Sequence, residues 1–234
     1  MKRNVGKIVI GIVCALGIIL LLRICLIRDN IEIGSYQSDL IINGRNLWLV
    51  EIKGMRDKAV QQKLNDNIRN DMEIYLEDYL EGHGFLRTRG FHSEVVGESY
   101  LYISYAISFG GASHSSDYKV VYDLKTGERV GLDDLFILNE GFVAGVKKYG
   151  KGYEYDNGES IVTYFGYEND SEEYIIEILE EIAMEPSEWN RIAEENGTKS
   201  YYKPDFLITE ENLYLSVPIP LDKLEDYLKV PKWW

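Results

Sequence analysis

The segment YLYISYAISF, residues 100–109, decides the fold, because its large apolar side chains fall at every second position. Leu101, Ile103, Tyr105, Ile107 and Phe109 share one side, and Tyr102, Ser104, Ala106 and Ser108 share the other. A period of two predicts a half-buried strand. The period returns after a loop at Tyr118, Val120, Tyr122 and Leu124, and Gly127 follows in a sequence suited to a tight reversal. Together these patterns predict an antiparallel hairpin.

On either side of this hairpin the sequence predicts a long helix. From Asp57 to the glycines Gly82 and Gly84, apolar residues recur at spacings of four and three, which places them in one stripe on a helix. The stripe consists of Val60, Leu64, Ile68, Met72, Tyr75 and Tyr79. The second helix is predicted from about Ser171 to Pro186, with Asp170–Glu173 as a capping box. Its inner face is expected to hold Tyr174, Ile175, Ile178, Leu179 and Ile182.

Shorter elements complete the prediction. They are a strand at residues 47–52, a helical turn at 135–138 capped by Asp133 or Asp134, a helical turn at 187–195, and a last hairpin that pairs 206–209 with 213–219. Pro218 and Pro220 suit an edge strand. Because the helices are inserted between antiparallel strands, we expect an α+β fold, an antiparallel sheet with two long helices packed on it.

The N-terminus has the pattern of an uncleaved membrane anchor. Ile8–Leu22 contains no polar side chain and follows Lys2, Arg3 and Lys7. When the segment is extended to Ile27, it has the roughly 20 residues that a helix needs to cross a bilayer, provided that the Arg23 side chain extends to the membrane interface. We therefore expect a single-pass protein of the cell membrane with an extracytoplasmic C-terminal domain. The expected organisation is a stub and transmembrane helix at 1–28, a tether at 29–39, an N-terminal module at 40–90 and a C-terminal module at 91–234.

The part beyond the anchor is strongly acidic. Residues 1–28 hold five of the 25 basic side chains and none of the 39 acidic ones, so residues 29–234 carry 20 basic against 39 acidic side chains, a formal charge of −19. This charge excludes nucleic acid as a partner. It favours cationic proteins, although a solvated surface that keeps the domain soluble explains it as well.

The best local candidate for a site is the segment 109–117, which lies between the two central strands. We predict that Gly110, Gly111, His114 and Asp117 contact a ligand there; a plain hairpin connection is the alternative. Neighbours in sequence rarely form a Ser/His/Asp triad, and no Gly-x-Ser-x-Gly elbow is present.

The remaining candidates for chemistry are weaker. His83 and His92 lie in a polar turn without metal-ligand spacing, and the acidic run from Asp156 to Glu173 lacks the spacing of a calcium loop. We name no catalytic residue and expect no metal and no cofactor. Two carboxylates facing a groove would still permit a glycosidase.

Three motifs resemble the RsiV-like extracytoplasmic domain family. They are Gly110-Gly111-Ala112 with His114, YDLKTGE at 122–128, and LDDLF at 132–136. Residues 61–67 are similar to the companion N-terminal module of that family, and residues 206–228 to its closing hairpin and helix. The sequence departs from the family where Ser113 separates Ala112 from His114 and where Ser115 replaces the usual glycine.

The resemblance implies an α+β domain that binds a ligand, as in the RsiV-type anti-sigma factor, whose ligand is the cationic enzyme lysozyme; the domain also precedes the catalytic domain of PdaC-type polysaccharide deacetylases. Residues 1–7 are too few for a sigma-binding domain and no deacetylase domain follows Trp234, so we expect neither activity. We expect a membrane-anchored module that binds or senses a cell-envelope protein or glycan, with lysozyme as a candidate. An enzyme acting on envelope polysaccharide, an accessory of such an enzyme and a structural envelope protein are the alternatives.

Overall fold

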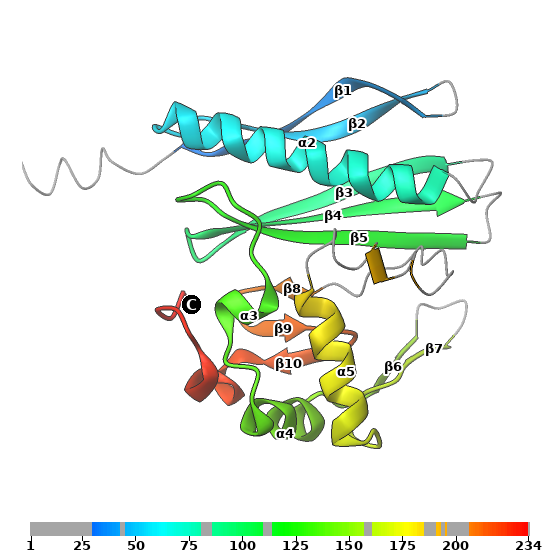
Figure 1. The fold of residues 1–234 in the computed structure, drawn as a ribbon, viewed down its shortest axis with the longest axis vertical. Helices are drawn as coiled ribbons and strands as arrows, with labels where there is room; N and C mark the ends of the chain where they lie inside the picture. The colour runs from blue at the N-terminus through cyan, green and yellow to red at the C-terminus, as the bar shows by residue number, and fades with distance from the viewer. Residues whose placement is uncertain are drawn as a thin grey trace, which may run out of the picture.

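The structure, a computed structural model, describes residues 30–42, 45–80, 86–109, 114–156, 161–184, 191–192, 195 and 206–233. Helices are mixed with antiparallel sheets in this part of the chain, which confirms the predicted α+β class. Figure 1 shows one long sheet across the middle, with two strands and the longest helix on one side and the C-terminal elements on the other.

The central sheet consists of β3 (Leu86–Val96), β4 (Tyr100–Phe109) and β5 (His114–Asp123), antiparallel throughout and in that order. Tyr105 pairs with Phe91 on one side and with Tyr118 on the other. The predicted strand at 100–109 and the hairpin that follows it are confirmed. Because β3 contains residue 90, the expected boundary between modules falls inside a strand of this sheet.

The first part of β4, from Tyr100 to Ile103, is buried on both faces. Leu101, Ile103 and Tyr105 lie in the core shared with the N-terminal elements, whereas Tyr100 and Tyr102 lie in the core of the C-terminal elements. Tyr100 and Tyr102 are only 7% and 5% exposed. The predicted half-buried strand is therefore wrong at the Tyr100 end. The C-terminal layer covers the face that holds Tyr102, which the sequence pattern had assigned to the polar side.

The N-terminal layer is formed by β1 (Glu32–Ile42), β2 (Arg45–Lys53) and α2 (Lys58–Leu80), with β1 and β2 paired antiparallel. The predicted strand and first helix are confirmed, and Leu64, Ile68 and Met72 of the apolar stripe are buried. Most of the expected tether at 29–39 belongs to β1, so that expectation is wrong. Most side chains of residues 32–39 in β1 are exposed, and this part of the strand therefore lacks the apolar alternation that would reveal it.

Amide side chains fasten α2 to the backbone around β2. Asn65 accepts a hydrogen bond from the Ile52 N–H at 2.8 Å and donates to the Ile52 carbonyl at 3.0 Å. Gln61 accepts from the Met55 N–H at 3.2 Å. Asp57 accepts from two N–H groups of the first turn and so caps the helix. Asn65 therefore satisfies both backbone groups of a fully buried residue.

The C-terminal layer contains the remaining elements between residues 130 and 233. They are α3 (Leu132–Leu135), α4 (Glu140–Tyr149), β6 (Tyr153–Asp156), β7 (Ile161–Tyr164), α5 (Glu172–Ala183), β8 (Leu207–Ile208), β9 (Asn212–Tyr214), β10 (Pro218–Pro220), η1 (Leu221–Lys223) and η2 (Glu225–Tyr227). β6 pairs with β7, and the last sheet has the order β10-β9-β8.

The helices of this layer agree in part with the sequence prediction. α5 confirms the second long helix, and Ser171 caps it by accepting from the Tyr174 N–H at 3.2 Å. Tyr174 is 51% exposed, so its predicted place on the inner face is wrong; it lies on the side of α5 away from Leu179. The short helical turn predicted at 135–138 is wrong in position: Asp134 accepts from the Gly131 N–H at 2.7 Å, so α3 begins at Leu132 and ends at Leu135.

The last sheet confirms the predicted pairing of β8 with β9. The second predicted strand is split, because the chain turns after Tyr214 and returns as β10. β10 is an edge strand, which suits Pro218 and Pro220. Gly82, Gly84, Pro186 and most of the helical turn expected at 187–195 lie outside the described residues.

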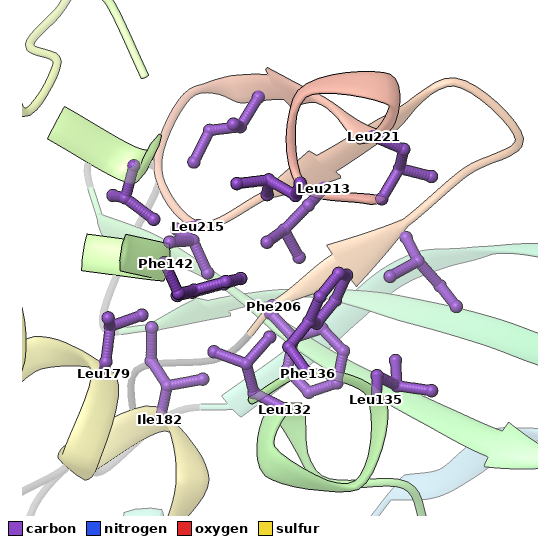
Figure 2. Close-up of a cluster of buried hydrophobic side chains, with 14 of the residues drawn as sticks. Leu132, Leu135, Phe136, Phe142, Leu179, Ile182, Phe206, Leu213, Leu215 and Leu221 are labelled. Carbon is purple, nitrogen blue, oxygen red and sulfur yellow. The ribbon is translucent and has the colours of Figure 1, made fainter. Parts of the chain in front are cut away.

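The C-terminal core is built around aromatic rings. Figure 2 shows Phe136 and Phe142 among the leucines of the surrounding elements, and their ring centroids are 5.2 Å apart. Trp233 packs edge-on against Tyr100 of β4 at 5.3 Å and against Phe136 at 6.2 Å. The end of the chain is thus held against the central sheet.

No described helix is long and apolar enough to cross a membrane. The span expected at residues 8–27 lies outside the described residues.

Replacing Asn65 by alanine should lower the free energy of unfolding by about 2 kcal/mol, because the buried N–H and carbonyl of Ile52 lose their partners. Urea denaturation followed by circular dichroism measures this difference. Asn70→Ala, at an exposed position of the same helix, is the matched control and should change stability by less than about 0.5 kcal/mol. Equal losses in the two variants would show that Asn65 does not fasten the helix.

Candidate functional site

The structure describes only part of the predicted ligand-binding segment. Gly110 and Gly111 lie outside the described residues. His114 begins β5 opposite Phe109, and Asp117 lies further along the same strand opposite Ala106. The segment expected to be a loop up to residue 117 is therefore strand from His114 onward, because its backbone pairs with β4 despite its polar sequence. A ligand contact by these four residues remains a prediction.

The histidine and metal candidates do not form a described site. His92 lies in β3 rather than in a turn, with its ring centroid 6.0 Å from that of Tyr102. His83 lies outside the described residues. Within the acidic run, Glu168 accepts from the Gly152 N–H at 3.2 Å. Among the described residues, no group of three or more histidine, cysteine, aspartate or glutamate side chains is placed to hold a metal ion.

The YDLKTGE motif forms a closed turn. Asp123 accepts from the N–H groups of Lys125 at 2.6 Å and Thr126 at 3.1 Å, which is the geometry of an Asx turn. Gly127 follows with φ of +73°, a conformation that favours glycine. The tight reversal predicted from the sequence is therefore present at this position.

The same turn docks on α2. A Cβ atom at Gly127 would lie 3.1 Å from the Val60 carbonyl, so the backbone of the turn touches the helix directly. Asn67 donates to the Gly127 carbonyl at 2.8 Å, and Lys63 forms an ion pair with Glu128. The nearby Lys63 ammonium lowers the pKa of the Glu128 carboxyl. These contacts join the end of the central hairpin to the N-terminal layer.

The LDDLF motif is also structural. Leu132, Leu135 and Phe136 are almost completely buried in the C-terminal core. Asp134 caps α3, and the Asp133 carbonyl accepts a hydrogen bond from the Lys229 ammonium. Both described motifs that carry the family resemblance therefore build the fold of this chain.

Two buried tyrosine hydroxyls lie in the N-terminal core. Tyr122 donates to the Asp71 carboxylate at 2.7 Å, and Tyr105 accepts from the Val50 N–H at 3.1 Å. Burial raises the pKa of Tyr122, and the Asp71 charge raises it further; burial also raises the pKa of Tyr105. Activated nucleophiles and bases need a pKa near the working pH, so both hydroxyls are neutral and structural.

Three exposed aromatic side chains lie at the β6–β7 hairpin. Tyr153 and Tyr164 pair across the strands and stack with ring centroids 4.7 Å apart. Phe165 follows directly and is 83% exposed. Exposed aromatic clusters mark interaction surfaces. The sequence pattern does not reveal this hairpin; its only signal is the short alternation of tyrosine with polar residues in YEYD, residues 153–156.

α5 follows this hairpin in the chain and presents an acidic face to solvent. The helix contains no basic residue and five glutamates, which are Glu172, Glu173, Glu177, Glu180 and Glu181. All except Glu181 are exposed. Burial raises the pKa of the Glu181 carboxyl, and the charge of Glu177 one turn away raises it further. Within the described part of the chain, Glu172, Glu177 and Glu180 form no ion pair.

No protein-family model matches the chain, and no curated protein matches it significantly. The similarity to the RsiV-like family therefore rests on the motifs quoted above.

Replacing Gly127 by alanine should lower the free energy of unfolding by about 1–3 kcal/mol, because alanine resists a positive φ and its Cβ presses on α2. Thermal unfolding measures the loss. Gly34→Ala in β1 is the control, because a Cβ there meets only the Glu51 carbonyl at an ordinary 3.8 Å; it should leave stability unchanged or slightly higher. A Gly127→Ala protein as stable as wild type would contradict a structural role for the motif.

Proposed function

We propose that the chain is a single-pass membrane protein whose extracytoplasmic domain binds or senses a cationic protein of the cell envelope, such as a basic wall hydrolase of the lysozyme type. In this proposal, residues 8–27 form the transmembrane helix. The domain that follows is an antiparallel sheet with two long helices, α2 and α5, packed on its two sides.

The observation that carries the proposal is the exposed acidic face of α5, together with the exposed aromatic residues Tyr153, Tyr164 and Phe165 at the hairpin that precedes it in the chain. Carboxylates that lack internal ion partners attract a cationic protein and orient its approach. Exposed aromatic rings supply contact area once the partner has arrived and stack against arginine side chains. The charge of −19 over residues 29–234 extends the same negative field to the rest of the domain.

The resemblance to the RsiV-like family supports the same proposal, because that family includes a domain that binds lysozyme. The described motifs bear on where a ligand would bind. Since the turn at 123–128 and the LDDLF segment stabilise the fold, a relative that shares them shares the scaffold and can bind through another surface.

The full-length protein in detergent should bind hen lysozyme at low salt, and the affinity should fall steeply as salt is added, because exposed charges are screened. The double variant Glu177→Gln and Glu180→Gln should slow association several-fold, as measured by biolayer interferometry. Glu32→Gln with Glu94→Gln removes the same charge from β1 and β3 and is the matched control. Absence of binding at low salt would rule out the lysozyme form of the proposal.

Deletion of residues 1–28 should move the protein from the membrane fraction to the soluble fraction, because the proposed span is lost. In intact spheroplasts, added protease should degrade the domain of the full-length protein while a cytoplasmic marker survives. Protection of the domain under these conditions would contradict an extracytoplasmic location.

A further inference from the structure

An open apolar groove lies between α4, α5 and η2. Its volume is about 630 Å³, within the range of ligand sites, and its apolar lining comes from Leu138, Val143, Ile176 and Tyr227. Ile176 is 38% exposed, whereas Val143, which also lines the groove, is buried, so the apolar lining is partly open to solvent. Single exposed apolar residues are ordinary, but a concave group of them marks a docking surface.

The walls of the groove are fixed by hydrogen bonds and close packing. Asn139 caps α4 by accepting from the Phe142 N–H at 3.0 Å. The Ile137 N–H donates to the Tyr227 carbonyl at 2.7 Å, which holds η2 beside the chain that leads into α4. A Cβ atom at Gly141 would lie 2.7 Å from the Tyr227 hydroxyl, so the ring rests directly on the first turn of α4. The groove is therefore formed before a partner arrives, which lowers the entropic cost of binding.

The rim of the groove is negative. Glu140 lines it directly. On α5, Glu172, Glu173 and Glu180 lie three or four residues from Ile176, the spacing that places helical neighbours side by side. Hydrogen bonds from its own backbone N–H and from the Ser171 side chain lower the pKa of the Glu173 carboxyl, and the charge of Lys147 on α4 lowers it further, so one of these four charges is partly balanced. Glu140, Glu172 and Glu180 form no ion pair with another described residue.

We infer that this groove is the docking site for an amphipathic, cationic segment of the partner protein. Apolar side chains of such a segment enter the groove, and its flanking lysine or arginine side chains pair with the carboxylates of the rim. Charge complementarity selects this occupant. An anionic lipid surface, an acidic peptide or a second copy of this acidic chain would each be repelled by the rim. The inference rests on the proposed function and names the surface through which the domain performs it.

The test uses a fluorescent leucine and lysine peptide about four helical turns long, with its leucines on one face. The control peptide has the same composition in scrambled order. Full-length protein in zwitterionic nanodiscs is titrated and followed by anisotropy, with empty nanodiscs measuring peptide bound to lipid. Wild type should bind the amphipathic peptide about tenfold more tightly than the scrambled one, because only the former buries a continuous apolar face.

Two variants test whether the peptide binds in the groove. Ile176→Asn should weaken binding about tenfold, and Glu140→Gln should weaken it several-fold at low salt only. Tyr174→Asn is the matched control, because Tyr174 is exposed on the same helix but does not line the groove. Equal affinity in wild type and Ile176→Asn, or equal affinity for the two peptides, would overturn the inference.

Lysozyme binding, measured on the same samples, separates the two proposals. If wild type binds lysozyme but Ile176→Asn leaves the affinity for the amphipathic peptide unchanged, the groove is not the docking site and the proposed function stands. If Ile176→Asn weakens binding of the amphipathic peptide but wild type does not bind lysozyme, the groove inference stands and the lysozyme form of the function is wrong.

Discussion

Burial of the β4–β5 hairpin on both faces is the constraint on which the structure depends. Alternate residues of the two strands belong to different cores, so Leu101 and Ile103 pack with α2 while Tyr100 and Tyr102 pack with the C-terminal layer. A shift of one residue in either strand would exchange the contents of the two cores. The pairing register is therefore fixed by packing from both sides, and the layers above and below the sheet cannot rearrange independently.

Polar contacts at the edges of this arrangement secure it. Asn65 binds both backbone groups of Ile52, and Asn67 holds the turn at Gly127 against α2. These contacts involve the residues that make the sequence resemble a known family. The family-like motifs thus determine how the layers join, whereas the exposed aromatic hairpin and the acidic face of α5 lie elsewhere, in the C-terminal layer. Scaffold and binding surface are distributed over different parts of the chain.

The sequence predicted the elements that carry a long, regular apolar pattern, such as α2, β4 and most of α5. It missed β1, β3 and α4. Most described side chains of β1 are exposed, those of β3 from Phe91 to Val95 are at most partly buried, and Gly141 and Gly145 interrupt the apolar residues of α4. The candidate site was predicted only as a local cluster of reactive residue types around His114. The groove at Ile176 joins residues from positions 138 to 227, and no local pattern signals a surface that arises from such distant segments.

In the proposed membrane-anchored arrangement, the early start of β1 would set the distance between the domain and the bilayer. Ordered pairing begins at Glu32, so with a span ending near residue 27 only a few residues remain, and at about 3.5 Å each they reach roughly 15 Å. Under that proposal, so short a connection would let the domain tilt but would keep it close to the membrane surface. The C-terminal layer lies across the central sheet from β1 (Figure 1). A partner would therefore reach the C-terminal layer only close to the membrane, and the domain would bind only molecules that penetrate to that depth.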